Sequence, residues 1–177
     1  MHAMSSIGFA AALCTLAGSA QAVTYNYVGN TTGAPTYNRA FEDFTGLSSV
    51  GASVNYQALR FTVSTSGSYA FTSSATGGWD NFLFLYSPSF NPAAALVNGV
   101  IANDDFPGIG TSGFTFGLTT GINYLVVTTG FSSGIDFGAY ANSISGPGSV
   151  NVIPEPATYG LMALGLAVVG FAARRSR

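Results

Sequence analysis

The sequence predicts an all-β protein whose central part is a single antiparallel β-sandwich of the jelly-roll type. Only 7% of the 177 residues are charged, whereas 14% are aromatic and 23 are glycine. Such a composition favours short strands joined by tight turns over helices. Apolar and polar residues alternate with a period of two in several segments, and turn residues recur at short intervals between them. These observations together favour two packed sheets.

The individual strands follow from this alternation. In residues 59–65, Leu59, Phe61 and Val63 face one way and polar residues face the other. The pair Ser66-Gly67 comes next and predicts a hairpin turn. Residues 81–86 are apolar after their first position, which predicts a strand buried on both faces. Further strands are expected within residues 25–28, 96–102, 114–118, 122–129 and 135–142.

The first 22 residues have the features of a secretory signal peptide. An apolar stretch covers residues 7–17, and Ala20-Gln21-Ala22 provides the small residues of a cleavage site. The mature chain is therefore expected to begin at Val23. The alternative is that this segment is a buried helix of the domain itself.

The carboxyl-terminal end combines three features in a fixed order. Pro154-Glu155-Pro156 comes first, then an uncharged apolar stretch over residues 157–173, and then an arginine cluster formed by Arg174, Arg175 and Arg177. As a helix, the apolar stretch would be roughly 25 Å long, close to the thickness of a bilayer core. The arginines are expected to stay in the cytoplasm, with the rest of the chain outside.

This tail resembles the PEP-CTERM sorting signal of Gram-negative bacteria. The resemblance implies that residues 154–177 are recognised and removed by the transpeptidase exosortase, after transient anchoring in the inner membrane. It also implies a final location at the cell surface or outside the cell, in association with exopolysaccharide and biofilm. The alternative is that the tail is a permanent membrane anchor.

Residues 23–153 remain as one domain with very few ionisable groups. The only histidine and the only cysteine, His2 and Cys14, belong to the signal peptide, and the chain contains no lysine. The mature domain therefore lacks the residues of a Ser-His-Asp triad, a cysteine nucleophile, a Schiff base or a Cys/His metal site. With two arginines against six acidic residues, it also lacks the basic surface that nucleic-acid binding requires.

One acidic cluster is a candidate site. Asp80 precedes the strand at 81–86, and Asn103-Asp104-Asp105 follows a later strand and leads into a glycine-containing loop. Oxygen ligands of this kind suit a hard cation such as Ca²⁺. The alternative is a solvated turn, since Asn and Asp are common in turns. Asp136, between two glycines, is interpreted as a surface acid.

The same region resembles the bacterial pre-peptidase C-terminal family of small β-sandwich domains. The resemblance rests on Trp79-Asp80 with the following strand, on Ile101-Ala-Asn-Asp-Asp105, and on the strands near Phe114 and Tyr124. Some members of that family bind Ca²⁺ here. The resemblance therefore implies Asp80, Asn103, Asp104 and Asp105 as the metal ligands.

We expect a non-enzymatic protein of the cell surface or extracellular matrix. One alternative is a Ca²⁺-dependent carbohydrate-binding module, and another is an accessory domain of a secreted peptidase. A hydrolase with a minimal pair of carboxylates is a further alternative. Trp79 and the tyrosines could stack on sugars, although such residues in β proteins more often pack in the core.

Overall fold

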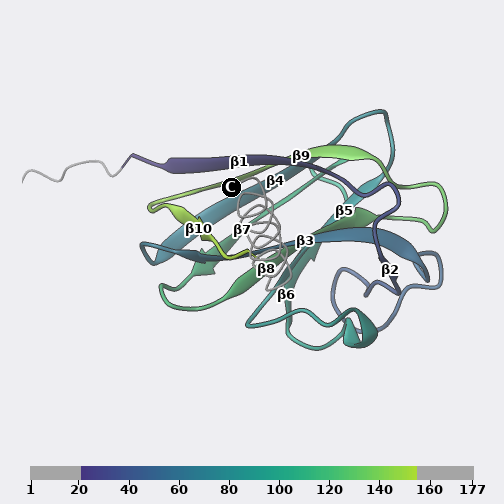
Figure 1. Cartoon of the computed structure of the whole chain (residues 1–177), viewed down its shortest axis with the longest axis horizontal. Helices are drawn as coiled ribbons and strands as arrows, with labels where there is room; N and C mark the ends of the chain where they lie inside the picture. The colour runs from purple at the N-terminus through teal and green to yellow at the C-terminus, as the bar shows by residue number, and fades with distance from the viewer. Residues whose placement is uncertain (1–20, 155–177) are drawn as a thin grey trace, which may run out of the picture.

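The computed structural model describes residues 21–154 as two antiparallel β-sheets packed face to face (Figure 1). The predicted signal peptide up to Ala20 lies outside these residues, as do Glu155, Pro156 and the terminal arginines. The elements are β1 (Val23–Asn30), β2 (Thr36–Tyr37), β3 (Val54–Val63), β4 (Gly67–Ala75), β5 (Asn81–Tyr86), the short 3₁₀ helix η1 (Pro92–Ala94), β6 (Gly99–Asn103), β7 (Thr111–Leu118), β8 (Tyr124–Gly130), β9 (Ala139–Gly146) and β10 (Val150–Val152).

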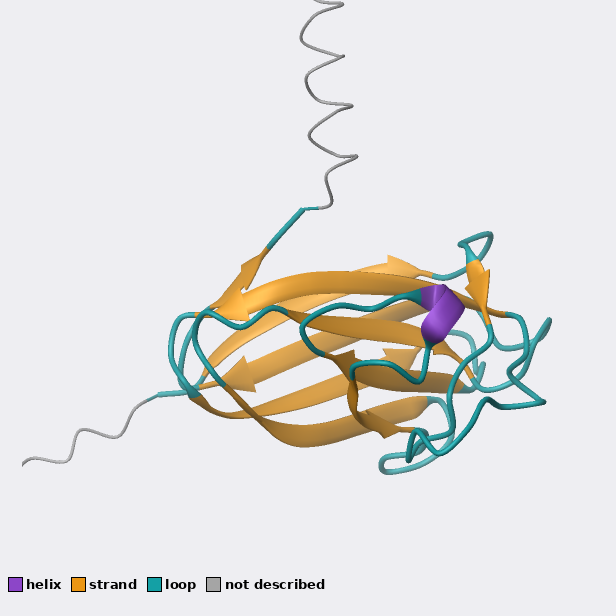
Figure 2. Cartoon of the chain, turned by 90° about the horizontal axis from the view of Figure 1, so that it is seen from below, coloured by secondary structure: helices purple, strands orange, loops and turns teal. Residues whose placement is uncertain are grey.

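From β3 onward, successive strands alternate between the two sheets except for β5 and β6, which are neighbours in the larger sheet. One sheet has the order β1-β9-β4-β7, and the other has the order β10-β3-β8-β5-β6, with β2 added beside β3. Figure 2 shows the two layers from the side, with the loops gathered mainly at one end. The all-β sandwich predicted from the sequence is confirmed.

The main core lies between the sheets, and a second core covers the outside of the larger sheet. Phe61, Phe71, Leu83 and Ile144 belong to the first, in which side chains of both sheets meet. The second is formed on the other face of β5 and is covered by the segments on either side of β2 and η1. Its members are buried and largely aromatic: Tyr37, Ala40, Val54, Phe82, Phe84, Tyr86, Ala95, Ala102 and Val127. All six residues of β5 are buried, as predicted.

The prediction of a hairpin at Ser66-Gly67 is wrong. β3 belongs to the larger sheet and β4 to the smaller one, so the turn carries the chain across the sandwich. Phe61 and Phe71 consequently face each other through the core, with ring centroids 6.3 Å apart. A period of two indicates which side chains point inward, but it does not indicate which sheet the strand joins.

The last strands also differ from the prediction. β9 begins at Ala139 and not at 135, because residues 131–138 form a loop fixed by hydrogen bonds to Asp136. β10 was not predicted and pairs with the end of β3.

Within residues 21–154, no helix is long and apolar enough to cross a membrane, and the apolar stretch 157–173 lies outside the described part.

Candidate functional site

The pairing of β5 with β6 brings the predicted acidic residues together. These strands are antiparallel, with Leu83 opposite Asn103, so the start of β5 lies beside the end of β6. Asp80 and the pair Asp104-Asp105 therefore meet at one end of the sandwich. One carboxylate oxygen from each of the three lies within 4.8 Å of the others. Antiparallel pairing of β5 with β6 thus places residues that are far apart in the sequence close together in space.

Asp136 holds the main chain of this site in place. Its Oδ1 accepts a hydrogen bond from the Asp80 N–H at 3.1 Å, and its Oδ2 accepts one from the Ser132 N–H at 2.8 Å. The Asp80 carbonyl in turn accepts a hydrogen bond from the Phe131 N–H at 3.0 Å. Asp136 is therefore not the free surface acid inferred from the sequence. Its position between two glycines gave no signal of this role.

Ser112 joins the two strands that carry the acidic residues. Its hydroxyl lies 2.8 Å from the Asn81 carbonyl oxygen and 2.6 Å from the Asp104 carbonyl oxygen. Ser112 is almost completely buried at the start of β7. This contact fixes the main chain beside Asp80 relative to Asp104. Sequence reasoning missed this residue because serine is common in strands of this chain.

Asn103, the last residue of β6, uses its side chain for hydrogen bonds within the protein. Its Oδ1 accepts a hydrogen bond from the Gly113 N–H at 2.9 Å, and its Nδ2 donates to Glu42 Oε1 at 3.3 Å. The structure therefore groups three of the four predicted ligands as carboxylates, whereas the side chain of the fourth bonds to β7 and to the segment between β2 and β3. Trp79 packs in the protein with 7% of its surface exposed and donates a hydrogen bond to the Ala139 carbonyl, so it offers no open stacking platform.

Burial and mutual repulsion disfavour the fully ionised form of the cluster. Oδ1 of Asp80 and Oδ1 of Asp104 are both buried and have no hydrogen-bond partner among the described residues. Burial, with the neighbouring Asp80 and Asp105 carboxylates, raises the pKa of Asp104 to about 7. The pKa of Asp80 is also raised, first by burial and then by the charges of Asp105 and Asp136. A divalent cation would satisfy the unpaired oxygens and offset this repulsion.

The donor set fits a hard cation. All three grouped side chains offer carboxylate oxygen, which is the ligand type of Ca²⁺ and Mg²⁺ sites. Ca²⁺ takes about six to eight oxygen ligands in flexible geometry, whereas Mg²⁺ requires a near-ideal octahedron.

Among the described residues, Arg39 is the only basic side chain near the cluster. Its guanidinium forms hydrogen bonds to main-chain carbonyls and not to the acidic residues. Only 2% of its surface is exposed. Its guanidinium donates to the Phe131 carbonyl from Nε and Nη2, and to the Ala40 carbonyl from Nη1. It also lies over the rings of Phe82 and Phe131, 4.5 and 4.8 Å from their centroids. Arg39 thus fastens the segment after β2 to the loop after β8.

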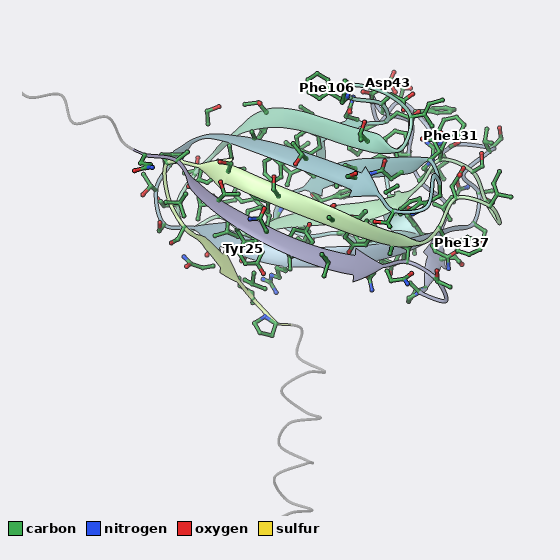
Figure 3. All side chains as sticks on the ribbon, turned by 90° about the horizontal axis from the view of Figure 1, so that it is seen from above. Tyr25, Asp43, Phe106, Phe131 and Phe137 are labelled. Carbon is green, nitrogen blue, oxygen red and sulfur yellow. The ribbon has the colours of Figure 1, made fainter. Side chains whose placement is uncertain are left out.

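A pocket of about 760 Å³ opens beside the acidic cluster and shares Asp104 with it. Its lining is largely apolar and includes three acidic side chains. The residues that line it include Phe41, Phe44, Phe82, Phe131, Val50, Val100, Ile101, Glu42, Asp43 and Asp104. Figure 3 shows Asp43, Phe106, Phe131 and Phe137 together at this loop end, whereas Tyr25 lies toward the other end.

Comparison with known proteins identifies the carboxyl-terminal segment. Residues 152–177 match the family model of the PEP-CTERM protein-sorting motif. The chain is therefore of the class of exported proteins that are sorted by their carboxyl-terminal end. This match supports its recognition by an exosortase during export. Pro154 is the last described residue and lies just after β10, so the processing segment directly follows the sandwich.

The described domain has the β-sandwich fold expected from the sequence. The solved structures to which it is similar share little sequence identity with it. No curated protein matches the chain. Among solved structures, it is similar to PliG, a periplasmic inhibitor of g-type lysozyme from Aeromonas hydrophila, with 12% identity, a TM-score of 0.37, and coverage of 75% of this chain and 91% of that chain. It is also similar to the CBM35 from Cellvibrio japonicus Abf62, with 16% identity, a TM-score of 0.35, and coverage of 73% and 99%.

Proposed function

We propose that this exported protein is a non-enzymatic module of the cell surface or extracellular matrix, and that its loop end binds Ca²⁺. The observation that carries the proposal is the convergence of Asp80, Asp104 and Asp105, two of which have buried and unpaired carboxylate oxygens. Calcium bound here would hold the start of β5 and the end of β6 together. The role of the module is structural and adhesive.

The geometry favours metal binding over hydrolysis. A glycosidase places two carboxyl groups on either side of a sugar, one as acid and one as base or nucleophile. Here three carboxylates converge on a single point, and like charges at that separation repel unless a cation or a proton lies between them. The mature domain also lacks histidine, cysteine and lysine, which supply most other general bases and nucleophiles.

Calcium titration tests the proposal on the exported form, from Val23 to Pro154, which contains every described strand and both cores. We expect saturable binding by calorimetry, with a dissociation constant on the order of 10⁻⁴–10⁻³ M or tighter, as in other extracellular modules. At about 100 times that constant, the bound ion should add about 2.7 kcal/mol to the free energy of unfolding. Absence of both heat and stabilisation at about ten times the weaker limit would refute the metal site.

A second function, polysaccharide binding, is favoured by the outer face of the smaller sheet. The side chains directed away from the core on its four strands include no charged and no aromatic residue. They are Thr24, Asn26, Val28, Asn30, Ser68, Ala70, Thr72, Ser74, Thr111, Thr115, Ala139, Ala141, Ser143 and Ser145, and the glycines 113 and 117 occupy two further positions on this face. A groove of about 390 Å³ crosses this face and is bordered by Asn26, Thr72 and Ser143.

Such a face suits a neutral chain of sugars, because hydroxyl and amide groups can replace the water that sugar hydroxyls lose. We expect Ala141→Lys, which places a long charged side chain in the groove, to abolish retention on neutral polysaccharide from the host. Ile122→Lys, on the β7–β8 turn, is the control and should leave retention unchanged. Equal retention of both variants would exclude this face as the binding surface.

A further inference from the structure

Within residues 21–154, β1 is a long strand that is paired on one side only. It forms the margin of the smaller sheet, next to β9 (Figure 1). All eight of its residues pair with β9 in one unbroken register, from Val23 opposite Gly146 to Asn30 opposite Ala139. β1 contains no charged residue, no proline and no bulge, which are devices that usually prevent an edge strand from pairing further. Its free side is therefore open to another strand.

The hydrogen bonds at the end of β1 show which main-chain groups point outward. In an antiparallel ladder, every second residue turns its N–H and C=O toward the neighbouring strand, and the residues between turn theirs away. The Asn30 N–H donates outward, to Gln57 Oε1 at 3.1 Å, whereas the Thr31 N–H donates to the Gly138 carbonyl beyond β9 at 2.9 Å. The even-numbered residues therefore point away from β9. Their main-chain groups have no hydrogen-bond partner among the described residues at three positions: Thr24, Asn26 and Val28.

The other edges of the two sheets offer less to a new strand. β6, β10 and β2 have only five, three and two residues. β7 is as long as β1, but its outward groups are partly used within the protein. The Gly113 N–H donates to Asn103 Oδ1 at 2.9 Å, and the Thr111 carbonyl accepts from the Phe106 N–H at 2.8 Å. β1 therefore has the longest free row of main-chain donors and acceptors in the described domain.

We propose that β1 pairs in antiparallel orientation with β1 of a second copy of this chain, so that the two smaller sheets become one continuous sheet. Outward residues must lie opposite outward residues for their main chains to bond. The two-fold arrangement that uses all three free positions places Asn26 opposite Asn26 of the second copy, and Thr24 opposite Val28. The contact is self-complementary and therefore closes at a dimer. This inference goes beyond the calcium and polysaccharide proposals and rests on neither.

The side chains of β1 favour a second copy over an unrelated strand. Tyr25 and Tyr27 point toward the core side of the sheet, are half-buried, and have ring centroids 5.8 Å apart. In the two-fold register, Tyr25 of each copy lies directly opposite Tyr27 of the other. Aromatic pairs in that position stabilise antiparallel sheets. A second copy thus supplies both the main-chain partners and a matching pair of rings.

The distribution of charge favours the same arrangement. Neither β1 nor β9 contains a charged residue, so this margin neither attracts a charged peptide nor repels its own copy. Asp136 and the acidic cluster lie at the end of the sandwich where β1 finishes. Figure 3 shows Asp43 at this end and Tyr25 toward the other. Antiparallel pairing places the acidic ends of the two copies far apart, which limits their repulsion.

Sedimentation equilibrium tests this inference on the form from Val23 to Pro154. We expect a monomer–dimer equilibrium with a dissociation constant on the order of 10⁻⁵–10⁻³ M, because one strand edge is smaller than a standard interface. The constant should be the same in calcium and in chelator. Asn26→Lys and Asn26→Glu should each weaken the dimer about tenfold at low ionic strength, because each places like charges opposite one another. Asn26 is exposed, so both variants should unfold at the wild-type temperature.

Mixing the two variants tests the register itself. An equimolar mixture of Asn26→Lys and Asn26→Glu should associate at least as strongly as the wild type, because the lysine then faces the glutamate. Thr115→Lys is the matched control, since Thr115 is exposed on the outer face of β7, the other edge strand of the same sheet. It should dimerise like the wild type.

Four results would overturn the inference. The first is a wild-type protein that stays monomeric up to about 1 mM, the weak limit expected for so small a contact. The second is association that survives both substitutions of Asn26 or is lost in Thr115→Lys, which would place the contact elsewhere. The third is a mixture that does not recover association, which would exclude the two-fold register. The fourth is growth beyond a dimer, which would indicate pairing between unlike edges.

Discussion

Replacing Arg39 by methionine is expected to destabilise the domain by about 3 kcal/mol. Methionine retains much of the apolar length but donates no hydrogen bond. The carbonyls of Phe131 and Ala40 would lose these donors, and an unsatisfied buried group costs about 1–3 kcal/mol. The stacking of the guanidinium on Phe82 and Phe131 would also be lost. Urea unfolding monitored by tyrosine and tryptophan fluorescence measures this loss.

The chain provides a close control for this substitution. Arg60 is the only other arginine among residues 21–154, and it is exposed on β3. Arg60→Met should therefore change the free energy of unfolding by less than about 0.5 kcal/mol. Arg39→Lys should recover only part of the loss, because an ammonium group cannot form the same planar fork to two carbonyls. Similar stabilities for Arg39→Met and Arg60→Met would show that the buried contacts of Arg39 are not needed for stability.

Arg39 also marks the limit of what the sequence could predict. The segment from 31 to 53 has little regular structure and only one short strand, so it has no period to interpret. Its position over β5 depends on a buried guanidinium and on aromatic side chains that meet from distant parts of the chain. By contrast, the strands β5 and β8 were predictable because their patterns are long, apolar and bounded by turn residues.

The acidic site was partly predictable for a similar reason. Asp80 and Asp104-Asp105 border two consecutive strands, and an antiparallel pair necessarily places the start of one beside the end of the next. The supporting residues could not be foreseen in this way. Ser112 and Asp136 come from a later strand and a later loop. They reach the site only because of the order of strands in the sheets, and the alternation of side chains does not predict that order.

Without calcium, the domain is expected to lose stability as the pH rises from about 4 to about 7. The folded-state pKa of Asp104 is raised to about 7, first by burial and then by Asp80 and Asp105, from an ordinary value of 3.8. The folded protein therefore holds this proton more tightly than the unfolded chain does. Below about pH 4 both states are protonated, and between the two pKa values ionisation favours the unfolded chain. Thermal unfolding in chelator should show a lower melting temperature at pH 8 than at pH 5.

Calcium should reverse this dependence. The ion binds the ionised carboxylates, so its affinity rises as Asp104 loses its proton, and the stabilisation it provides should be larger at pH 8 than at pH 5. Asp104→Asn should remove both effects. In chelator, this variant should have a higher melting temperature at pH 8 and a flatter pH dependence than the wild type. In calcium, it should show no stabilisation.

Asp43→Asn is the control, because Asp43 is exposed and bonds to Thr45 outside the cluster. It should retain the full calcium response. A calcium response that survives in Asp104→Asn would place the ion elsewhere, and an unchanged pH dependence would show that Asp104 is not the group that opposes folding at neutral pH.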